Sequence, residues 1–272
     1  MQLDALLRSL YQYSKNFFND IIVIYKTSHP LHTKSYQLLL NRFPDIKFYK
    51  ENLFNSFKKR IIKSLNNDYE YIMFMTDDDI LFDNISESDK YDIVNLMKEY
   101  NLATFSLRLG INCIYSHPAN KFFKVNNYQV IKNKYLIWNW TEQMEGDFNY
   151  PLSLDGHLFL KNQLLNWVKN FKGLNPNHLE SYLQKFNNNI SIKMGSFVKS
   201  KLVGIPVNLV SNYSSNYYGK THYFSPIELA QRYINDEEID FFSMDFSNII
   251  GAHQELKLVF RKKINLKFQF EF

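Results

Sequence analysis

The chain has 272 residues, of which 45% are hydrophobic and 17% aromatic. This composition supports a sizeable core and is too apolar for a disordered protein. The formal net charge of +5 is small for a nucleic-acid-binding protein, so we expect no nucleic-acid partner. One cysteine, Cys113, allows no disulfide framework within the chain, and the first residues lack a signal-peptide pattern. Both features favour a cytoplasmic location.

The first third of the chain alternates predicted helices with predicted strands. Leucines at helical spacing predict a helix over residues 2–18, and the aliphatic run at 21–25 predicts a buried strand. The alternation continues with helix 33–43, strand 46–49, helix 54–65 and strand 69–75. This order predicts an α/β fold with a mostly parallel sheet flanked by helices. Such a sheet usually begins with a strand, so we expect its first strand to be missing.

The later elements are predicted from weaker patterns. Residues 111–150 show no clear period and are expected to be irregular or to form short antiparallel strands. No linker or internal repeat stands out, so we expect one domain over residues 1–272. The remaining predicted elements are helices at 88–100, 164–171, 178–186 and 226–233, and strands at 103–109, 151–160 and 201–210.

Three adjacent carboxylates, Asp77, Asp78 and Asp79, directly follow the strand predicted at 69–75. Ligands of open α/β sheets bind beyond the carboxyl ends of the strands. In an extended backbone Asp77 and Asp79 would project to one side and could together meet a hard cation such as Mn²⁺ or Mg²⁺. The cation would neutralise a diphosphate and stabilise it as a leaving group. A solvated acidic turn after a strand is the alternative interpretation.

An apolar strand that ends in Thr-Asp-Asp-Asp-Ile-Leu-Phe resembles the DxD motif of GT-A (Rossmann-like) glycosyltransferases. The segments 105–110, 151–159 and 205–210 are similar to parts of bacterial surface-polysaccharide transferases of that superfamily, and the resemblance covers roughly residues 1–235. It implies a nucleotide-sugar-binding half at 1–85, an acceptor and catalytic half at 86–235, and a C-terminal extension at 236–272. The implied reaction moves a sugar from a nucleotide-diphosphate donor to a glycan or lipid-linked acceptor.

The resemblance also implies roles for individual residues. Asp77 would contact the ribose or base side of the nucleotide, Asp79 would coordinate the metal, and Asp78 would support either role. A further metal ligand, usually a histidine near the C-terminus, could be His222 or His253. We favour His222 because it follows a tyrosine-rich loop at 212–219 that could act as a lid.

Two acids are candidates for the base that an inverting transfer needs. Glu180 lies near the start of a predicted helix, where the resemblance places an acidic residue of inverting enzymes; charge compensation in the first helical turn is its alternative role. Asp155 precedes Gly156, which would let a substrate approach the backbone closely. A plain Asp-Gly turn is the alternative there.

Basic residues are expected to bind two kinds of anion, the phosphates of a nucleotide and the headgroups of a membrane. Arg108 could meet phosphate oxygens of the nucleotide. The basic tail at 261–263 could touch an anionic membrane, where lipid-linked acceptors reside, or could simply keep the surface soluble. The first prediction would place the protein at the inner face of a membrane without spanning it.

Two other functions remain open. A haloacid-dehalogenase-type phosphatase also has an Asp-x-Asp loop after a strand, but its later Gly-Asp-x-x-x-Asp segment has no counterpart, because Gly146-Asp147 is followed by Phe-Asn-Tyr-Pro. A transferase-like binding module without catalysis is the second alternative.

Overall fold

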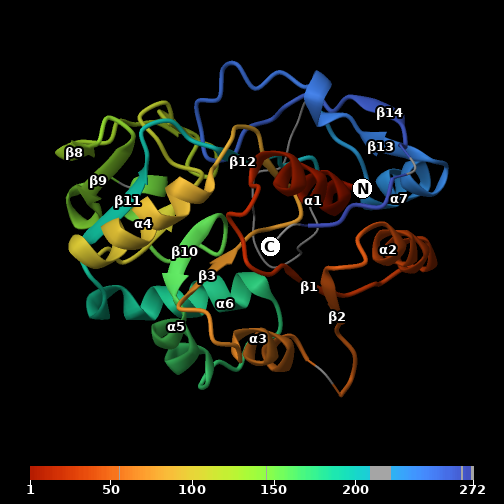
Figure 1. Cartoon of the computed structure of the whole chain (residues 1–272), viewed down its shortest axis with the longest axis horizontal. Helices are drawn as coiled ribbons and strands as arrows, with labels where there is room; N and C mark the ends of the chain where they lie inside the picture. The colour runs from red at the N-terminus through yellow and green to blue at the C-terminus, as the bar shows by residue number, and fades with distance from the viewer. Residues whose placement is uncertain (55, 145, 209–221, 265, 271–272) are drawn as a thin grey trace.

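The computed structural model describes residues 1–54, 56–144, 146–208, 222–264 and 266–270. Its centre is a mixed sheet of six strands in the order β3-β10-β5-β11-β9-β8, with helices above and below it in Figure 1. The strands of this sheet are β3 (Tyr71–Phe74), β5 (Phe105–Ser106), β8 (Tyr128–Ile131), β9 (Tyr135–Asn139), β10 (His157–Leu160) and β11 (Lys193–Phe197).

The prediction of a mostly parallel sheet is wrong for these six strands. Only β5 and β11 run parallel, whereas the other four neighbouring pairs are antiparallel. Antiparallel neighbours can be joined by short turns, while parallel neighbours need a crossover. Strands β8 and β9 form such a hairpin inside the 111–150 segment, which agrees with the short antiparallel strands expected there.

One parallel pair follows from the predicted alternation. β1 (Ile22–Tyr25) and β2 (Lys47–Lys50) pair in parallel and are joined by helix α2 (Pro30–Arg42). Among the described strands, none bridges this pair to β3. The expected absence of a first strand is therefore compatible with the pairing but is not tested by it.

Strand β3 separates two layers of helices. Its side chains alternate, with Tyr71 and Met73 packing against one core cluster and Ile72 and Phe74 against another. The first cluster is filled from α1 (Gln2–Tyr13), α2, α4 (Glu87–Glu99) and α7 (Pro226–Ile234), and the second from α3 (Phe57–Leu65), α5 (Lys161–Val168) and α6 (Pro176–Leu183). Because both faces of β3 are covered, the chain that leaves its carboxyl end is held in a fixed direction.

Helix α1 is shorter than the helix predicted over 2–18. It ends at Tyr13, and residues 15–17 form a turn. Asn16 takes a positive φ of 58° there, which asparagine tolerates better than most residues. The helical spacing of apolar residues in the sequence extends to Phe17, because this side chain also packs into the core although it lies beyond the end of the helix.

Residues of the predicted C-terminal extension are tied to α1 and α2. β13 (Glu237–Ile239) pairs with β14 (Phe260–Lys262). Glu238, which is fully buried, accepts a 2.6 Å hydrogen bond from Arg42 of α2, and Arg42 also bonds Asp4 of α1 at 2.8 Å. These ionic contacts bring the 236–270 segment against the helices that cover the acidic turn.

The same contacts involve the basic tail at 261–263, whose contact with a membrane stays a prediction. Arg261 forms ion pairs with Glu238 at 2.8 Å and with Asp240 at 3.2 Å. Lys263 donates a 2.6 Å hydrogen bond to the Tyr233 carbonyl oxygen. Two of the three basic side chains are therefore occupied within the protein. In the described ranges no helix is long and apolar enough to cross a bilayer.

Candidate functional site

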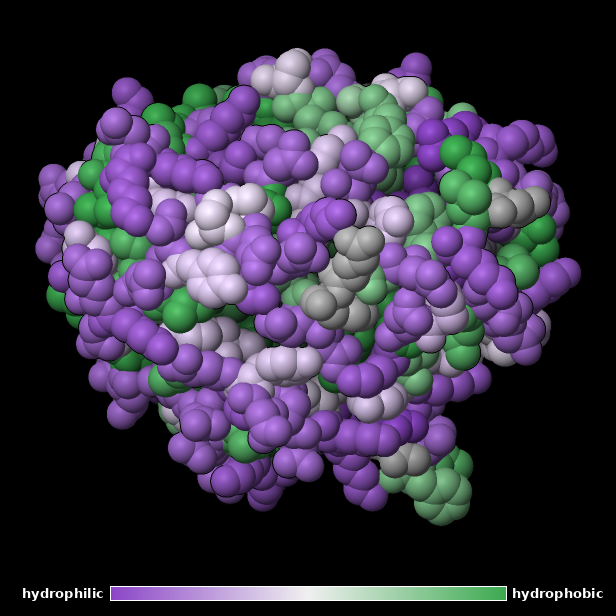
Figure 2. Space-filling model, viewed as in Figure 1, coloured by the Kyte–Doolittle hydropathy of each residue, from purple (hydrophilic) through white to green (hydrophobic). Residues whose placement is uncertain are grey.

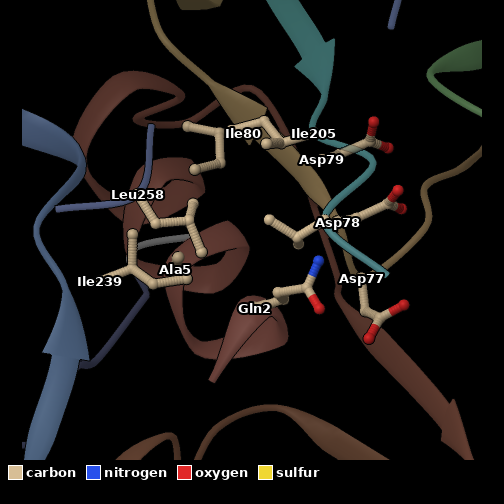
Figure 3. Close-up of a pocket in the computed structure, with 10 residues that line it drawn as sticks. Gln2, Ala5, Asp77, Asp78, Asp79, Ile80, Ile205, Ile239 and Leu258 are labelled. Carbon is tan, nitrogen blue, oxygen red and sulfur yellow. The ribbon is translucent and has the colours of Figure 1, made fainter. Parts of the chain in front are cut away.

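The acidic triplet lies in a turn between two strands. β3 ends at Phe74, and β4 (Asp79–Leu81) begins at Asp79. The Asp79 amide donates a 3.2 Å hydrogen bond to the Thr76 carbonyl oxygen, while the Thr76 amide donates a 3.1 Å bond back to the Asp79 carboxylate. The predicted extended geometry, with Asp78 opposite its neighbours, is therefore wrong. Figure 3 shows all three carboxylates pointing to one side, away from apolar residues such as Ala5 and Leu258.

A second strand fixes this turn from outside. β12 (Leu202–Gly204) pairs with β4 antiparallel, so that Gly204 lies opposite Asp79. The Ile205 amide donates a 2.9 Å hydrogen bond to the Asp78 carbonyl oxygen. A Cβ at position 204 would lie 2.5 Å from Cδ2 of His253 and 3.5 Å from Oδ1 of Asp79. A side chain at this position would displace the His253 ring, so glycine leaves room for the imidazole to pack against this strand.

Asp155 is the point at which the distant parts of the site meet. Its Oδ2 lies 2.6 Å from the Arg108 guanidinium and 2.9 Å from Nε2 of His253. Thr76 Oγ1 donates a 3.3 Å hydrogen bond to its Oδ1, and Asp79 shares a side-chain hydrogen bond with it. Asp155 thus joins the acidic turn to the segments after β5 and before β14.

The residues around Asp155 are buried deeply enough to shift their pKa values. Burial opposes the charge of Asp155, but Arg108 and the hydrogen bonds from His253 and Asp79 lower its pKa. Burial and the nearby Asp155 charge raise the pKa of Asp79 well above its usual range. Desolvation, together with Asp77 and Asp155, raises the pKa of Asp78 to about 6. These shifts favour the charged form of Asp155 and the neutral form of Asp79.

Arg108, predicted to meet phosphate oxygens, lies buried against the Asp155 loop. Its side chain is 3% exposed, and it donates hydrogen bonds to the Asp155 carbonyl oxygen at 2.6 Å and to Ser153 Oγ at 3.0 Å. With the Asp155 ion pair, these contacts direct the guanidinium inward. A phosphate-binding role for Arg108 stays a prediction that its buried contacts do not favour.

The structure brings His253 rather than His222 to the carboxylates. Burial and Arg108 oppose protonation of His253, but its contact with Asp155 raises its pKa overall. His222 is half-buried, and its metal role stays a prediction. The lid predicted at 212–219 lies outside the described residues.

Glu180 reaches the Asp155 loop from helix α6. Its Oε1 accepts hydrogen bonds from Ser153 Oγ and from the Leu154 amide, both at 2.9 Å. The helix begins at Pro176, so Glu180 lies in its second turn and the first turn holds no acid. The predicted first-turn position is therefore wrong, and with it the interpretation of Glu180 as compensation for the helix dipole. Among the described residues, none donates a hydrogen bond to Oε2 of Glu180.

The site has oxygen atoms that could bind a cation, but they do not form a complete ligand set. Oδ1 of Asp79 is buried and accepts no hydrogen bond from the described residues. Within those same ranges, no three His, Cys, Asp or Glu side chains are grouped as a metal centre. The orphaned oxygen and the crowded carboxylates fit a hard cation that also takes ligands from a bound molecule. A small cavity of about 10 Å³, near the minimum for one water molecule, borders the triplet on its apolar side.

No protein-family model matches the chain. In sequence the chain is 29% identical over 222 residues to a bifunctional glycosyltransferase, pgtA, of Dictyostelium discoideum. The match takes in 74% of this chain but 28% of that protein, so the chain spans just over a quarter of the relative's length.

Two solved structures overlap the chain partly. S. aureus TarS 1-349 covers 74% of this chain and 56% of its own, with a TM-score of 0.43 and 14% identity. TarS 1-349 in complex with UDP overlaps with a TM-score of 0.40, again at 14% identity, over 74% of this chain and 55% of its own.

Proposed function

We propose that this chain is a glycosyltransferase that moves a sugar from a nucleotide-diphosphate donor to a glycan or lipid-linked acceptor, in surface-polysaccharide synthesis. The observation that carries the proposal is the convergence of Asp78, Asp79 and Asp155 at the carboxyl end of β3, with an orphaned buried oxygen on Asp79. The sequence similarity to a bifunctional glycosyltransferase supports the same class of reaction.

Mn²⁺ or Mg²⁺ is the cation that this site would take. Asp79 would be its main protein ligand, with Asp77 and Asp78 close by on the same side of the turn. The ion would supply charge neutralisation to the leaving diphosphate. Its positive charge would also offset the burial and the carboxylate repulsion that together raise the pKa of Asp78 and Asp79.

Glu180 is our candidate for the base of an inverting reaction. Asp155 is held by Arg108 and His253, which lower its pKa and make it a weak base. Glu180 uses one oxygen to hold the backbone of the Asp155 loop, and its second oxygen would take the acceptor hydroxyl proton. Asp155 would then act as a positioning residue that fixes the acidic turn.

The donor prediction is tested by calorimetric titration of the intact chain with UDP, GDP and CMP, each with and without Mn²⁺. We expect one nucleotide to bind in the presence of Mn²⁺ and to bind at least about tenfold more weakly without it. Nucleotide binding that is equally strong with and without Mn²⁺ would contradict the proposed role of the carboxylates. Failure of every nucleotide to bind would favour the non-catalytic alternative.

The base is tested by comparing Glu180→Gln with Glu180→Ala. Glutamine keeps the oxygen that accepts hydrogen bonds from Ser153 and Leu154 but cannot take a proton. If Glu180 is the base, the transfer rate of Glu180→Gln falls by about 10² to 10⁴ while its melting temperature stays near that of the wild type. If Glu180 only positions the loop, Glu180→Gln keeps most of the activity and Glu180→Ala alone loses it.

A further inference from the structure

The loop between β2 and α3 carries two exposed apolar side chains at its tip. Leu53 is 98% exposed and Phe54 is 81% exposed, the two highest values among the large hydrophobic side chains described. In Figure 1 this loop extends beyond the neighbouring helices, and Figure 2 shows a hydrophobic protrusion at the same edge. We call Leu53 and Phe54 the apolar tip.

The apolar tip is presented by a defined backbone. The Phe54 amide donates a 3.0 Å hydrogen bond to the Asn52 side chain, and Lys59 donates a 2.8 Å bond to the Phe54 carbonyl oxygen. Phe57, the first residue of α3, is 5% exposed and anchors the loop in the core. Local hydrogen bonds therefore hold the backbone at Phe54 while the two apolar side chains stay exposed to solvent.

Basic side chains lie on the two elements that flank the apolar tip, the end of β2 and helix α3. Helix α3 buries Phe57, Ile61 and Leu65, and its sequence FKKRIIKSL has no acidic residue. Lys59 and Lys63 are exposed and lie one helical turn apart, and Lys50 is exposed at the end of β2. The one acid inside the loop, Glu51, is half-buried. We call Lys50, Lys59 and Lys63 the basic collar.

We propose that the apolar tip and the basic collar dock this protein on an anionic lipid bilayer. An apolar insertion and several lysines together give stable but reversible membrane attachment, where either alone is weak. Protein interfaces are instead depleted of lysine and enriched in arginine and large aromatic side chains around a shaped pocket. This surface differs from the basic tail at 261–263. The proposal does not depend on the proposed transfer reaction, because vesicle binding can be measured without transferase activity.

The experiment is cosedimentation of the intact chain with phosphatidylcholine vesicles that contain 0% or 30% phosphatidylserine. We expect binding only to the anionic vesicles, falling as NaCl rises from 50 to 500 mM. Leu53→Ser/Phe54→Ser should weaken this binding by at least about 20-fold. Lys59→Gln/Lys63→Gln should weaken it by about 10- to 30-fold.

Matched controls use other exposed side chains of the same kinds. Phe122 is 72% exposed, so Phe122→Ser should bind like the wild type, as should Lys121→Gln/Lys124→Gln. The added fluorescence of Phe54→Trp should be quenched by brominated lipid, which tests insertion in a protein that keeps an apolar tip. The proposal is overturned by equal binding to neutral vesicles, by equal binding of all variants, or by a tip-dependent self-association without vesicle binding.

Discussion

Asp155→Asn is expected to lower the free energy of unfolding by about 3 to 5 kcal/mol. The substitution keeps the shape of the side chain but removes the charge that faces Arg108 at 2.6 Å. Arg108 is 3% exposed, so its guanidinium would stay buried without a counter-ion. Urea denaturation at pH 7 measures this as a lower midpoint with an unchanged slope.

The pH dependence of the same variant follows from the lowered pKa of Asp155. A carboxylate whose folded pKa is depressed stabilises the protein above its unfolded pKa, near 3.9, and loses this contribution as the pH falls towards the folded value. The difference between wild type and Asp155→Asn should therefore be full at pH 6 to 7. It should shrink as the pH falls below about 4.

A surface pair provides the matched control. Glu70 and Lys98 are 3.0 Å apart, and both side chains are more than half exposed. Glu70→Gln should cost less than about 1 kcal/mol, because exposed ion pairs contribute little. Equal losses in the two variants would show that Asp155 does not compensate a buried charge.

The sequence predicts the location of the acidic turn well but not its shape. The strand before Asp77 is apolar enough to be recognised, and both faces of it are indeed covered. The turn is made by mutual hydrogen bonds of Thr76 and Asp79, and the spacing of three identical residues contains no sign of this. The shape depends on β12, a strand far along the chain that pairs with β4.

The residues that surround the acidic turn were predicted less well than the turn itself, for physical reasons. Both histidines were candidates, but only the pairing of Gly204 with residue 253 shows which imidazole reaches Asp155. Strand β11 was missed because its sequence, KMGSF, is not a hydrophobic run. A Cβ at Gly195 would lie 2.7 Å from Leu102 and 2.9 Å from Phe105, so both side chains would have to move. These features arise from packing between distant segments, which local patterns do not encode.

Asp79→Asn is expected to have the opposite effect from Asp155→Asn on stability and the larger effect on binding. The raised pKa of Asp79 means that its carboxyl favours the neutral form, which shares a hydrogen bond with Asp155. An asparagine amide can replace that neutral donor, so we expect the free energy of unfolding to change by less than about 1 kcal/mol near pH 4. Metal-dependent binding of the nucleotide should weaken by at least about 100-fold, because the main metal ligand is lost.

The pH profile separates this explanation from simple damage. A carboxyl group whose folded pKa is raised binds more protons when folded, so wild-type stability falls as the pH rises from about 4 through the folded pKa of Asp79. Asp79→Asn has no such group and should therefore become as stable as the wild type or more stable at pH 7 to 8. Asp83→Asn removes a carboxylate that is 43% exposed and pairs with Lys201, and it should leave nucleotide binding unchanged. Strong destabilisation of Asp79→Asn at pH 5 would show that Asp79 is charged in the free protein, and unchanged binding would place the cation elsewhere.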